Sequence, residues 1–174
     1  YYDDCQKSAG GKIKVKNFNS VAISDDKPAL QSPYDNSWQK SYSFGGNEAI
    51  ILPKAQYNKS EDLIFSEEKK EFSIGFWAKM HETGASFGSQ EQYAFDFSNI
   101  QGYFSESGTK FSVSGLKEFW GDKDASYQGQ NWILESKTGL KTKEWNHYAL
   151  ARNKKEITLY VNGERCDSVD ARLA

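Results

Sequence analysis

The side chains with the clearest binding chemistry lie in one irregular stretch, from Ser114 to Asn131. It combines aromatic rings with amides and carboxylates: Phe119, Trp120, Asp122, Asp124, Tyr127, Gln128, Gln130 and Asn131. Sugars are recognised by this combination, because rings cover their apolar faces while amides and carboxylates hydrogen-bond their hydroxyls. We therefore predict a ligand site formed by Trp120, Asp122, Asp124, Tyr127, Gln128 and Asn131.

The length of this stretch supports a functional interpretation. It lacks clean periodicity, and a loop this long within a compact domain is usually functional or mobile. Exposed aromatic side chains on a loop that a rigid scaffold carries are typical of a binding site. The alternative is that Phe119 and Trp120 turn inward and form a small core under the loop.

No residue pattern points to catalysis. Glycan hydrolysis needs two carboxylates held close together on one face, and no Glu-x-Asp-x-x-Glu arrangement occurs. His81 and His147 have no nearby Ser or Cys in a nucleophile context. The sequence therefore predicts a protein that is not an enzyme, with glycan hydrolysis as the minor alternative.

The strands that would support such a loop are predicted most clearly near the end of the chain. Alternating side chains predict three antiparallel strands, Trp145–Arg152, Glu156–Val161 and Arg165–Val169. The dipeptide Asn162-Gly163 tolerates positive φ and predicts a tight type I′ turn between the last two strands. One face of this meander is expected in the core, with Trp145 as a large core residue.

Earlier segments show the same period of two. Residues Lys12 to Ile23 alternate with an interruption, which predicts one bulged strand or two short ones. The segments Ser41–Phe44 and Glu48–Leu52 are expected to pair with each other around Gly45-Gly46-Asn47. Further strands are predicted at Phe72–Met80, Gln92–Phe97, Gly102–Phe104, Lys110–Val113 and Trp132–Leu134.

Three blocks of these strands resemble a known family. They are Ser41-Tyr-Ser-Phe-Gly-Gly-Asn-Glu-Ala-Ile-Ile-Leu-Pro, Phe72-Ser-Ile-Gly-Phe-Trp-Ala-Lys, and Trp145-x-His followed by Leu159-Tyr-Val-Asn-Gly. Their order and spacing resemble the laminin-G-like jelly roll of the concanavalin A-like lectin/glucanase superfamily, over roughly residues 38–169. The resemblance implies an all-β fold, a two-layer antiparallel β-sandwich with little or no helix, that usually binds glycans or proteins outside the cell.

The same resemblance places hard oxygen ligands on a strand-end turn. Asp96 and Asn99 lie where distant pentraxin-like relatives keep metal ligands, and Asp122 and Asp124 offer alternating carboxylates in the long loop. Calcium prefers several such oxygens converging from loops. We therefore predict that Asp122, Asp124, Asp96 and Asn99 are ligands of a calcium ion, although Asp and Asn are also ordinary turn residues.

Length and charge limit the alternatives. The 174 residues suit one domain over residues 12–174, with residues 1–11 as a lead-in or linker. The resemblance implies about two further strands after the last hairpin, so either these strands lie outside the chain or Lys12–Ile23 supplies part of the closure. The formal net charge of −2 comes from interspersed charges, which argues against nucleic acid as a partner. No apolar run is long enough to span a bilayer, so no membrane insertion by this chain is expected.

Two cysteines lie near opposite ends of the sequence, Cys5 and Cys166. The first strand of a sandwich commonly lies beside a late one, so the geometry allows a disulfide between Cys5 and Cys166. The alternative is two unrelated thiols. A disulfide would fit an oxidising compartment.

These observations favour a glycan-binding or host-receptor-binding module, lectin-like and adhesive, of a larger extracellular or cell-surface protein such as an adhesin, a pilus or a phage-tail component. Its partner would be a glycan, a glycoprotein receptor or a protein within a larger surface assembly. The second interpretation is a structural or protein–protein interaction module that binds no sugar.

Overall fold

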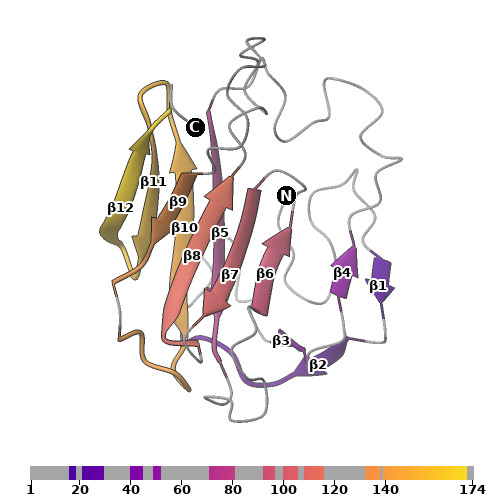
Figure 1. Ribbon diagram of the computed structural model, residues 1–174. Helices are drawn as coiled ribbons and strands as arrows, with labels where there is room; N and C mark the ends of the chain where they lie inside the picture. Colours follow the sequence, from indigo (N-terminus) through magenta and orange to yellow (C-terminus); the bar gives the residue numbers. More distant parts are fainter. Residues whose placement is uncertain are drawn as a thin grey trace. The chain divides into compact units, whose positions relative to one another are not determined.

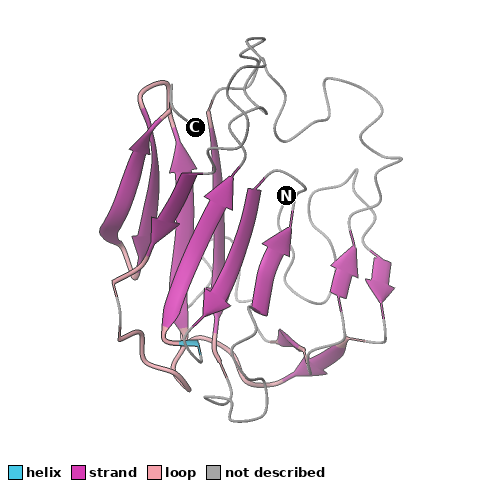
Figure 2. Cartoon of the chain, viewed as in Figure 1, coloured by secondary structure: helices cyan, strands magenta, loops and turns pink. Residues whose placement is uncertain are grey.

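The computed structural model is built from short antiparallel strands (Figure 1). It describes residues 16–18, 21–29, 40–44, 49–51, 71–80, 92–96, 100–105, 108–115, 132–137 and 139–171. Within these residues there is no α-helix, and a single residue, Gly108, has the 3₁₀ conformation (Figure 2). The all-β prediction is therefore confirmed. The described residues also include no helix long and apolar enough to cross a membrane.

The chain groups into two compact units, Tyr1–Leu63 and Ile64–Ala174. The prediction of one domain over residues 12–174 stays a prediction. The first unit contains two short antiparallel pairs, built from β1 (Lys16–Phe18), β2 (Ala22–Ser24), β3 (Ser41–Ser43) and β4 (Ala49–Ile51). Two short strands, β1 and β2, thus occupy the end of the predicted Lys12–Ile23 segment.

The pairing in this unit differs from the sequence-based expectation. Strand β3 pairs with β2, and β4 pairs with β1, so the segments around 41–44 and 48–52 do not pair with each other as expected. Polar contacts flank the β2–β3 pair: Lys40 Nζ lies 2.5 Å from Asp25 Oδ1, and Ser41 Oγ donates to the Asp26 carbonyl at 2.5 Å. The expectation was wrong because alternation within a segment shows that it is a strand but does not show which distant strand it pairs with.

The second unit contains two four-stranded antiparallel sheets. The first sheet has the order β12-β11-β10-β5 and the second the order β6-β7-β8-β9. Their bounds are β5 (Phe72–Ala78), β6 (Gln92–Asp96), β7 (Ile100–Ser105), β8 (Lys110–Gly115), β9 (Trp132–Glu135), β10 (Asn146–Arg152), β11 (Glu156–Val161) and β12 (Glu164–Asp170). Each of these strands overlaps a segment that the alternation predicted.

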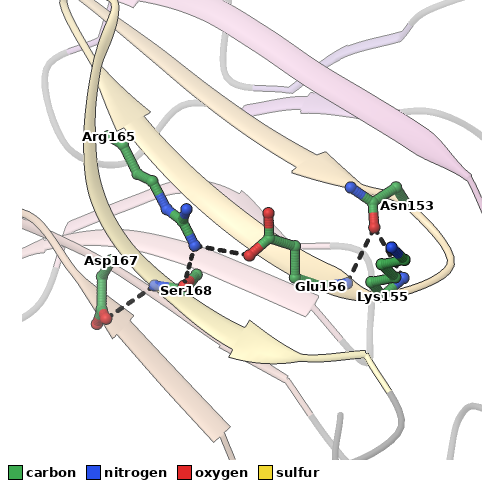
Figure 3. A network of polar contacts seen from close by, with 6 residues as sticks. All are labelled: Asn153, Lys155, Glu156, Arg165, Asp167 and Ser168. Atoms are coloured by element: carbon green, nitrogen blue, oxygen red, sulfur yellow. Dashed lines mark hydrogen bonds and ion pairs between the residues drawn. The ribbon is translucent and has the colours of Figure 1, made fainter.

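Tight turns join β10, β11 and β12 as the sequence predicted. Asn162 and Gly163 have φ angles of 51° and 82°, which is the positive-φ pair that a type I′ turn requires. In the preceding turn, Asn153 Oδ1 accepts from the backbone N–H groups of Lys155 at 2.7 Å and Glu156 at 3.0 Å (Figure 3). An asparagine side chain that bonds its own turn in this way stabilises the reversal of the chain.

The two sheets face each other through aromatic side chains. Phe111 of the second sheet is 1% exposed, and its ring centroid lies 4.8 Å from that of Tyr148 and 5.8 Å from that of Phe76 in the first sheet. Phe104 meets the Tyr148 ring edge-on at 5.4 Å. Aliphatic side chains complete this core: Ile100, Val113, Leu134, Leu150, Ile157, Leu159 and Val161. The described part of the second unit is therefore a β-sandwich.

Glycines let large rings lie flat against the second sheet. The Trp132 ring covers Gly115, its partner on the adjacent strand, so closely that a Cβ at this position would overlap the ring. Gly102 is covered by the Phe95 ring in the same way. Both glycines are buried, and their missing side chains make room for the aromatic core.

The prediction that Trp145 is a core residue is wrong. In β10 the buried positions are Asn146, Tyr148, Leu150 and Arg152, so the core takes the even-numbered residues. Trp145 precedes the strand and is only half-buried, with Lys79 Nζ 5.9 Å from its ring centroid. The strand alternates as predicted, but the even-numbered residues, and not those in phase with Trp145, face the second sheet.

Phe111→Ala is expected to destabilise the protein by about 3–5 kcal/mol, because it removes the ring that the other core aromatics contact. Trp145→Ala is the matched control, and it should cost less, about 1–2 kcal/mol, because Trp145 is only half-buried and lies outside the aromatic core. Urea unfolding monitored by circular dichroism measures both values. Equal losses for the two variants would contradict this assignment of the core.

Gly115→Ala is expected to destabilise the protein by about 1–3 kcal/mol, because the new methyl group forces the buried Trp132 ring to move. Gly75→Ala is the control in another strand, since its Cβ would lie 3.6 Å from His147 Nε2, an ordinary contact. That control should be neutral or slightly stabilising. A neutral Gly115→Ala variant in thermal unfolding would show that the ring packing is not restrictive.

Candidate functional site

Most of the predicted site residues lie outside the described residues. They are Trp120, Asp122, Asp124, Tyr127, Gln128, Asn131, Asn99 and Cys5. The structure does describe where the long segment joins the sheet, because Gly115 and Trp132 are direct partners in β8 and β9. The segment 116–131 therefore leaves and re-enters the second sheet at one point.

Asp96 is the described member of the predicted ligand and metal site, and it ends β6 on the exposed side of the second sheet. It lies opposite Gln101, whose Nε2 donates to Asp96 Oδ2 at 3.2 Å. Gln101 is the partner of Ser114, and Ser114 is the partner of Ile133. These four side chains form one row across the outer face, adjacent to the row that ends in the Gly115–Trp132 pair.

Two tyrosines form the next aromatic feature of the same face. Tyr93 and Tyr103 are partners on β6 and β7, and their ring centroids lie 5.8 Å apart at an interplanar angle of 51°. Tyr93 is 54% exposed although it is a large aromatic residue. We call the outward group Tyr93, Asp96, Gln101, Tyr103 and Ser114 the Tyr93 face.

A β-bulge brings Tyr93 and Asp96 to the same face. They are three positions apart, so in a regular strand they would point to opposite sides of the sheet. The register shifts between Tyr93 and Phe95, which leaves Ala94 as the extra residue. Phe95 consequently points into the core, where its ring centroid lies 6.0 Å from that of Phe76, and Asp96 points outward.

The charges on the described part of this sheet are few. Lys110 Nζ lies 2.7 Å from Glu135 Oε1, and only 18% of the lysine side chain is exposed. This ion pair compensates the lysine within the sheet. Asp96 Oδ2 accepts a hydrogen bond from the Gln101 amide at 3.2 Å.

The outer face of the first sheet carries a second aromatic pair. The Trp77 and His147 rings are partners on β5 and β10, and their centroids lie 5.1 Å apart. Burial lowers the pKa of His147. The backbone N–H of His147 donates to Asn162 Oδ1 at 2.8 Å. His147 thus packs on a tryptophan.

The described residues alone do not supply a calcium site. Among them, no three His, Cys, Asp or Glu side chains come together in a way that could hold a metal ion. Asp96 Oδ2 accepts from the Gln101 amide, which is a hydrogen bond and not a ligand set. The other predicted ligands, Asn99, Asp122 and Asp124, lie outside the described residues, so calcium stays a prediction.

Cys166 is half-buried against the core and forms no disulfide with any described residue. It sits in the irregular register of β12, and its Sγ lies 3.6 Å from the Glu164 carbonyl oxygen. Cys5 lies outside the described residues. The predicted pairing of Cys5 with Cys166 therefore stays a prediction.

The Tyr93 face combines groups that are used in ligand recognition. Exposed tyrosine rings offer apolar surface together with a hydroxyl, and the neighbouring amide and carboxylate offer directed hydrogen bonds. Tyr93, Tyr103 and Gln101 were missed in the sequence, because nothing in Gln92–Phe97 marks the extra residue that turns Tyr93 and Asp96 to one side.

Comparison with known proteins supplies a family-level match. A family model described as the concanavalin A-like lectin/glucanases superfamily matches residues 44–172. The matched range includes both four-stranded sheets of the second unit. None of the curated proteins compared with the chain matches it.

Two solved structures share the fold at low sequence identity. The binding domain of botulinum neurotoxin DC, in complex with rat synaptotagmin II, has a TM-score of 0.51 and 10% identity, and the alignment covers 94% of this chain and 37% of that one. Domain 4 of AbnA, a GH43 extracellular arabinanase from Geobacillus stearothermophilus in complex with arabinotriose, has a TM-score of 0.50 and 12% identity, with 91% and 65% covered. The chain thus spans less than two thirds of either structure.

The depressed pKa of His147 predicts a loss of stability on mild acidification. Because the folded protein holds this imidazole below its ordinary pKa of 6.5, the unfolded chain binds the proton first. The contribution of the neutral His147 to the free energy of unfolding is fully present above about pH 6.5, and it is lost as the pH falls through the lower pKa of the folded state. His147→Gln should flatten this fall, which urea titrations between pH 7.5 and 5.5 measure. An unchanged slope would show that His147 is not its source.

Proposed function

The chain belongs to the concanavalin A-like lectin/glucanases superfamily, and from this premise we propose that it is a non-catalytic, lectin-like module that binds a glycan or a glycosylated receptor. It acts within a larger extracellular or surface protein, such as an adhesin, a pilus or a phage-tail component. Both compared structures of this fold were solved with a binding partner, one a protein and one a trisaccharide, which supports the proposal at the level of the fold.

The observation that carries the proposal is the Tyr93 face. Tyr93 is 54% exposed, and its ring contacts that of Tyr103, its partner on the adjacent strand. The Asp96–Gln101 pair stands in the adjacent row, so rings and directed hydrogen-bonding groups lie side by side. This is the chemistry that sugars require.

The long loop belongs to the same proposal. The segment 116–131 joins the sheet at the Gly115–Trp132 pair, next to the row of Gln101 and Ser114. We propose that Trp120, Asp122, Asp124, Tyr127, Gln128 and Asn131 extend the binding surface from there. Calcium held by Asp122 and Asp124 with Asp96 and Asn99 would order the loop, so chelation is part of the test.

The acidic residues of the second sheet support a non-catalytic role. Glycosidases hold two carboxyl groups about 5–9.5 Å apart across the scissile bond. Asp96 and Glu135 lie on the opposite edge strands, β6 and β9, which three strand spacings separate by about 14 Å. Glu135 is also paired with Lys110. These two carboxylates therefore do not form a hydrolytic pair.

A protein partner without sugar is the second candidate function. Ile133 is 53% exposed at the end of the row that begins at Asp96. An exposed apolar side chain among polar ones suits the edge of a protein interface. This alternative predicts a blank glycan array and a surface that buries against another protein.

Tyr93→Ala and Trp120→Ala are each expected to abolish binding on a glycan array while leaving the melting temperature within about 2 °C of wild type. Tyr160→Ala is the matched control, since Tyr160 is a half-buried tyrosine of the first sheet. It should leave binding unchanged. Arrays probed with and without a calcium chelator separate the contribution of the metal.

Two results would count against this proposal. A wild-type array without any signal in calcium would favour the structural or protein–protein interpretation. A melting temperature of Trp120→Ala as low as that of Phe111→Ala would show that Trp120 packs under the loop.

A further inference from the structure

We propose that Asn162 is a deamidation site that the folded chain protects, so that opening of the β10–β12 meander exposes it to an irreversible loss of its amide. Asn162-Gly163 is the only Asn-Gly pair in the sequence, and it forms the turn between β11 and β12. The modification limits the lifetime of the module, and it does not depend on whether the Tyr93 face binds a glycan.

An asparagine followed by glycine is chemically labile, because glycine has no side chain to hinder attack by its own backbone nitrogen. The nitrogen of Gly163 loses its proton and forms a bond to Cγ of Asn162, while the Cγ–Nδ2 bond breaks and ammonia leaves with that proton. Water then opens the resulting succinimide ring. Hydrolysis at Cγ leaves aspartate at position 162, and hydrolysis at the backbone carbonyl leaves isoaspartate, whose main chain runs through the former side chain.

Strand β10 holds the Asn162 side chain at both ends of its amide. The Oδ1 atom accepts from the backbone N–H of His147 at 2.8 Å, and Nδ2 donates to Asn146 Oδ1 at 2.9 Å. The backbone N–H of Asn162 also donates to the His147 carbonyl at 2.8 Å. The side chain thus supplies the acceptor that a strand carbonyl supplies in a regular ladder, while the backbone turns at a φ of 51°.

These contacts oppose the reaction, although Asn162 is exposed to solvent. The attack makes Cγ tetrahedral and draws it into a ring with the Gly163 nitrogen, and the amide cannot keep both hydrogen bonds to β10 in that geometry. Loss of two hydrogen bonds of ordinary strength slows the reaction by at least about tenfold. Deamidation of the folded protein is therefore limited by local opening of the turn.

The products do not fit the place of Asn162. Asn146 is 7% exposed, and its Nδ2 donates to the carbonyls of Lys141 and Glu144, both at 3.1 Å, so its Oδ1 is the atom that faces position 162. Aspartate still accepts from the His147 N–H, but it presents a second oxygen to this fixed acceptor, and neither has a hydrogen to donate. Isoaspartate lengthens the main chain within a two-residue turn. Deamidation in an open state therefore hinders reclosing.

The first experiment measures deamidation of the full chain by mass spectrometry at mildly alkaline pH, folded in buffer and unfolded in guanidinium chloride. The peptide that trypsin releases, residues 156–165, contains Asn162 and reports both the amide-to-acid conversion and the isoaspartate isomer. The unfolded chain should lose this amide at least about tenfold faster than the folded chain. Equal rates in the two states, or no conversion in the unfolded chain, would overturn the proposal.

Asn162→Asp supplies one product directly, and Asn153→Asp is the matched control with the same change of charge. Asn153 is also an exposed turn residue of the first sheet, but its Oδ1 accepts from two backbone N–H groups, which a carboxylate does equally well. Asn162→Asp should lower the melting temperature by about 5 °C, and the control by less than about 2 °C. Equal shifts would show that the contact with Asn146 does not make the product unfit.

Asn162→Gly gives a readout that needs no aspartate variant. It keeps the positive φ of the turn and has no amide to lose. Prolonged unfolding at alkaline pH followed by refolding should convert wild type into a lower-melting species, whereas Asn162→Gly should refold to its own starting melting temperature. The same loss in both proteins, or no loss in wild type, would contradict the assignment of the damage to Asn162.

Discussion

Contact between aromatic rings across the two sheets is the constraint on which the sandwich depends. Tyr148 stacks on Phe76 within its own sheet at 5.4 Å and meets Phe104 and Phe111 of the other sheet at 5.4 and 4.8 Å. Rings in offset or edge-on arrangements gain energy beyond the area they bury. The largest fully buried side chains of both sheets lie in this core, while the outer faces carry polar residues together with the aromatic pairs Tyr93–Tyr103 and Trp77–His147.

In the described part, polar side chains protect one edge of the sandwich and a β-bulge alters the other. On one side, Asp167 of β12 accepts from the backbone N–H of Glu135 in β9 at 3.1 Å, so a side chain satisfies an edge donor that has no strand beside it. Arg165 lies on the same strand and bonds both Glu156 and Ser168 at 2.6 Å (Figure 3). Such polar edges discourage pairing with another chain. On the other side, the bulge in β6 twists the edge strand and re-aims its side chains.

That bulge links the core to the surface that we assign to binding. Because Ala94 is an extra residue, Phe95 joins the aromatic core while Tyr93 and Asp96 on either side point outward. One local irregularity therefore satisfies the core and assembles a face with a ring, a carboxylate and an amide. Bulges are frequent near functional sites for this reason.

Local sequence chemistry determined the strands, the Asn162-Gly163 turn and the family, since a period of two and a positive-φ dipeptide are properties of short segments. Three features depended on distant residues and were decided only by tertiary structure. The alternation around Trp145 has two phases, and the opposing sheet selects one. The partners of β3 and β4 are strands from earlier in the chain, β2 and β1. The bulge that brings Tyr93 beside Asp96 exists only relative to the register of β7.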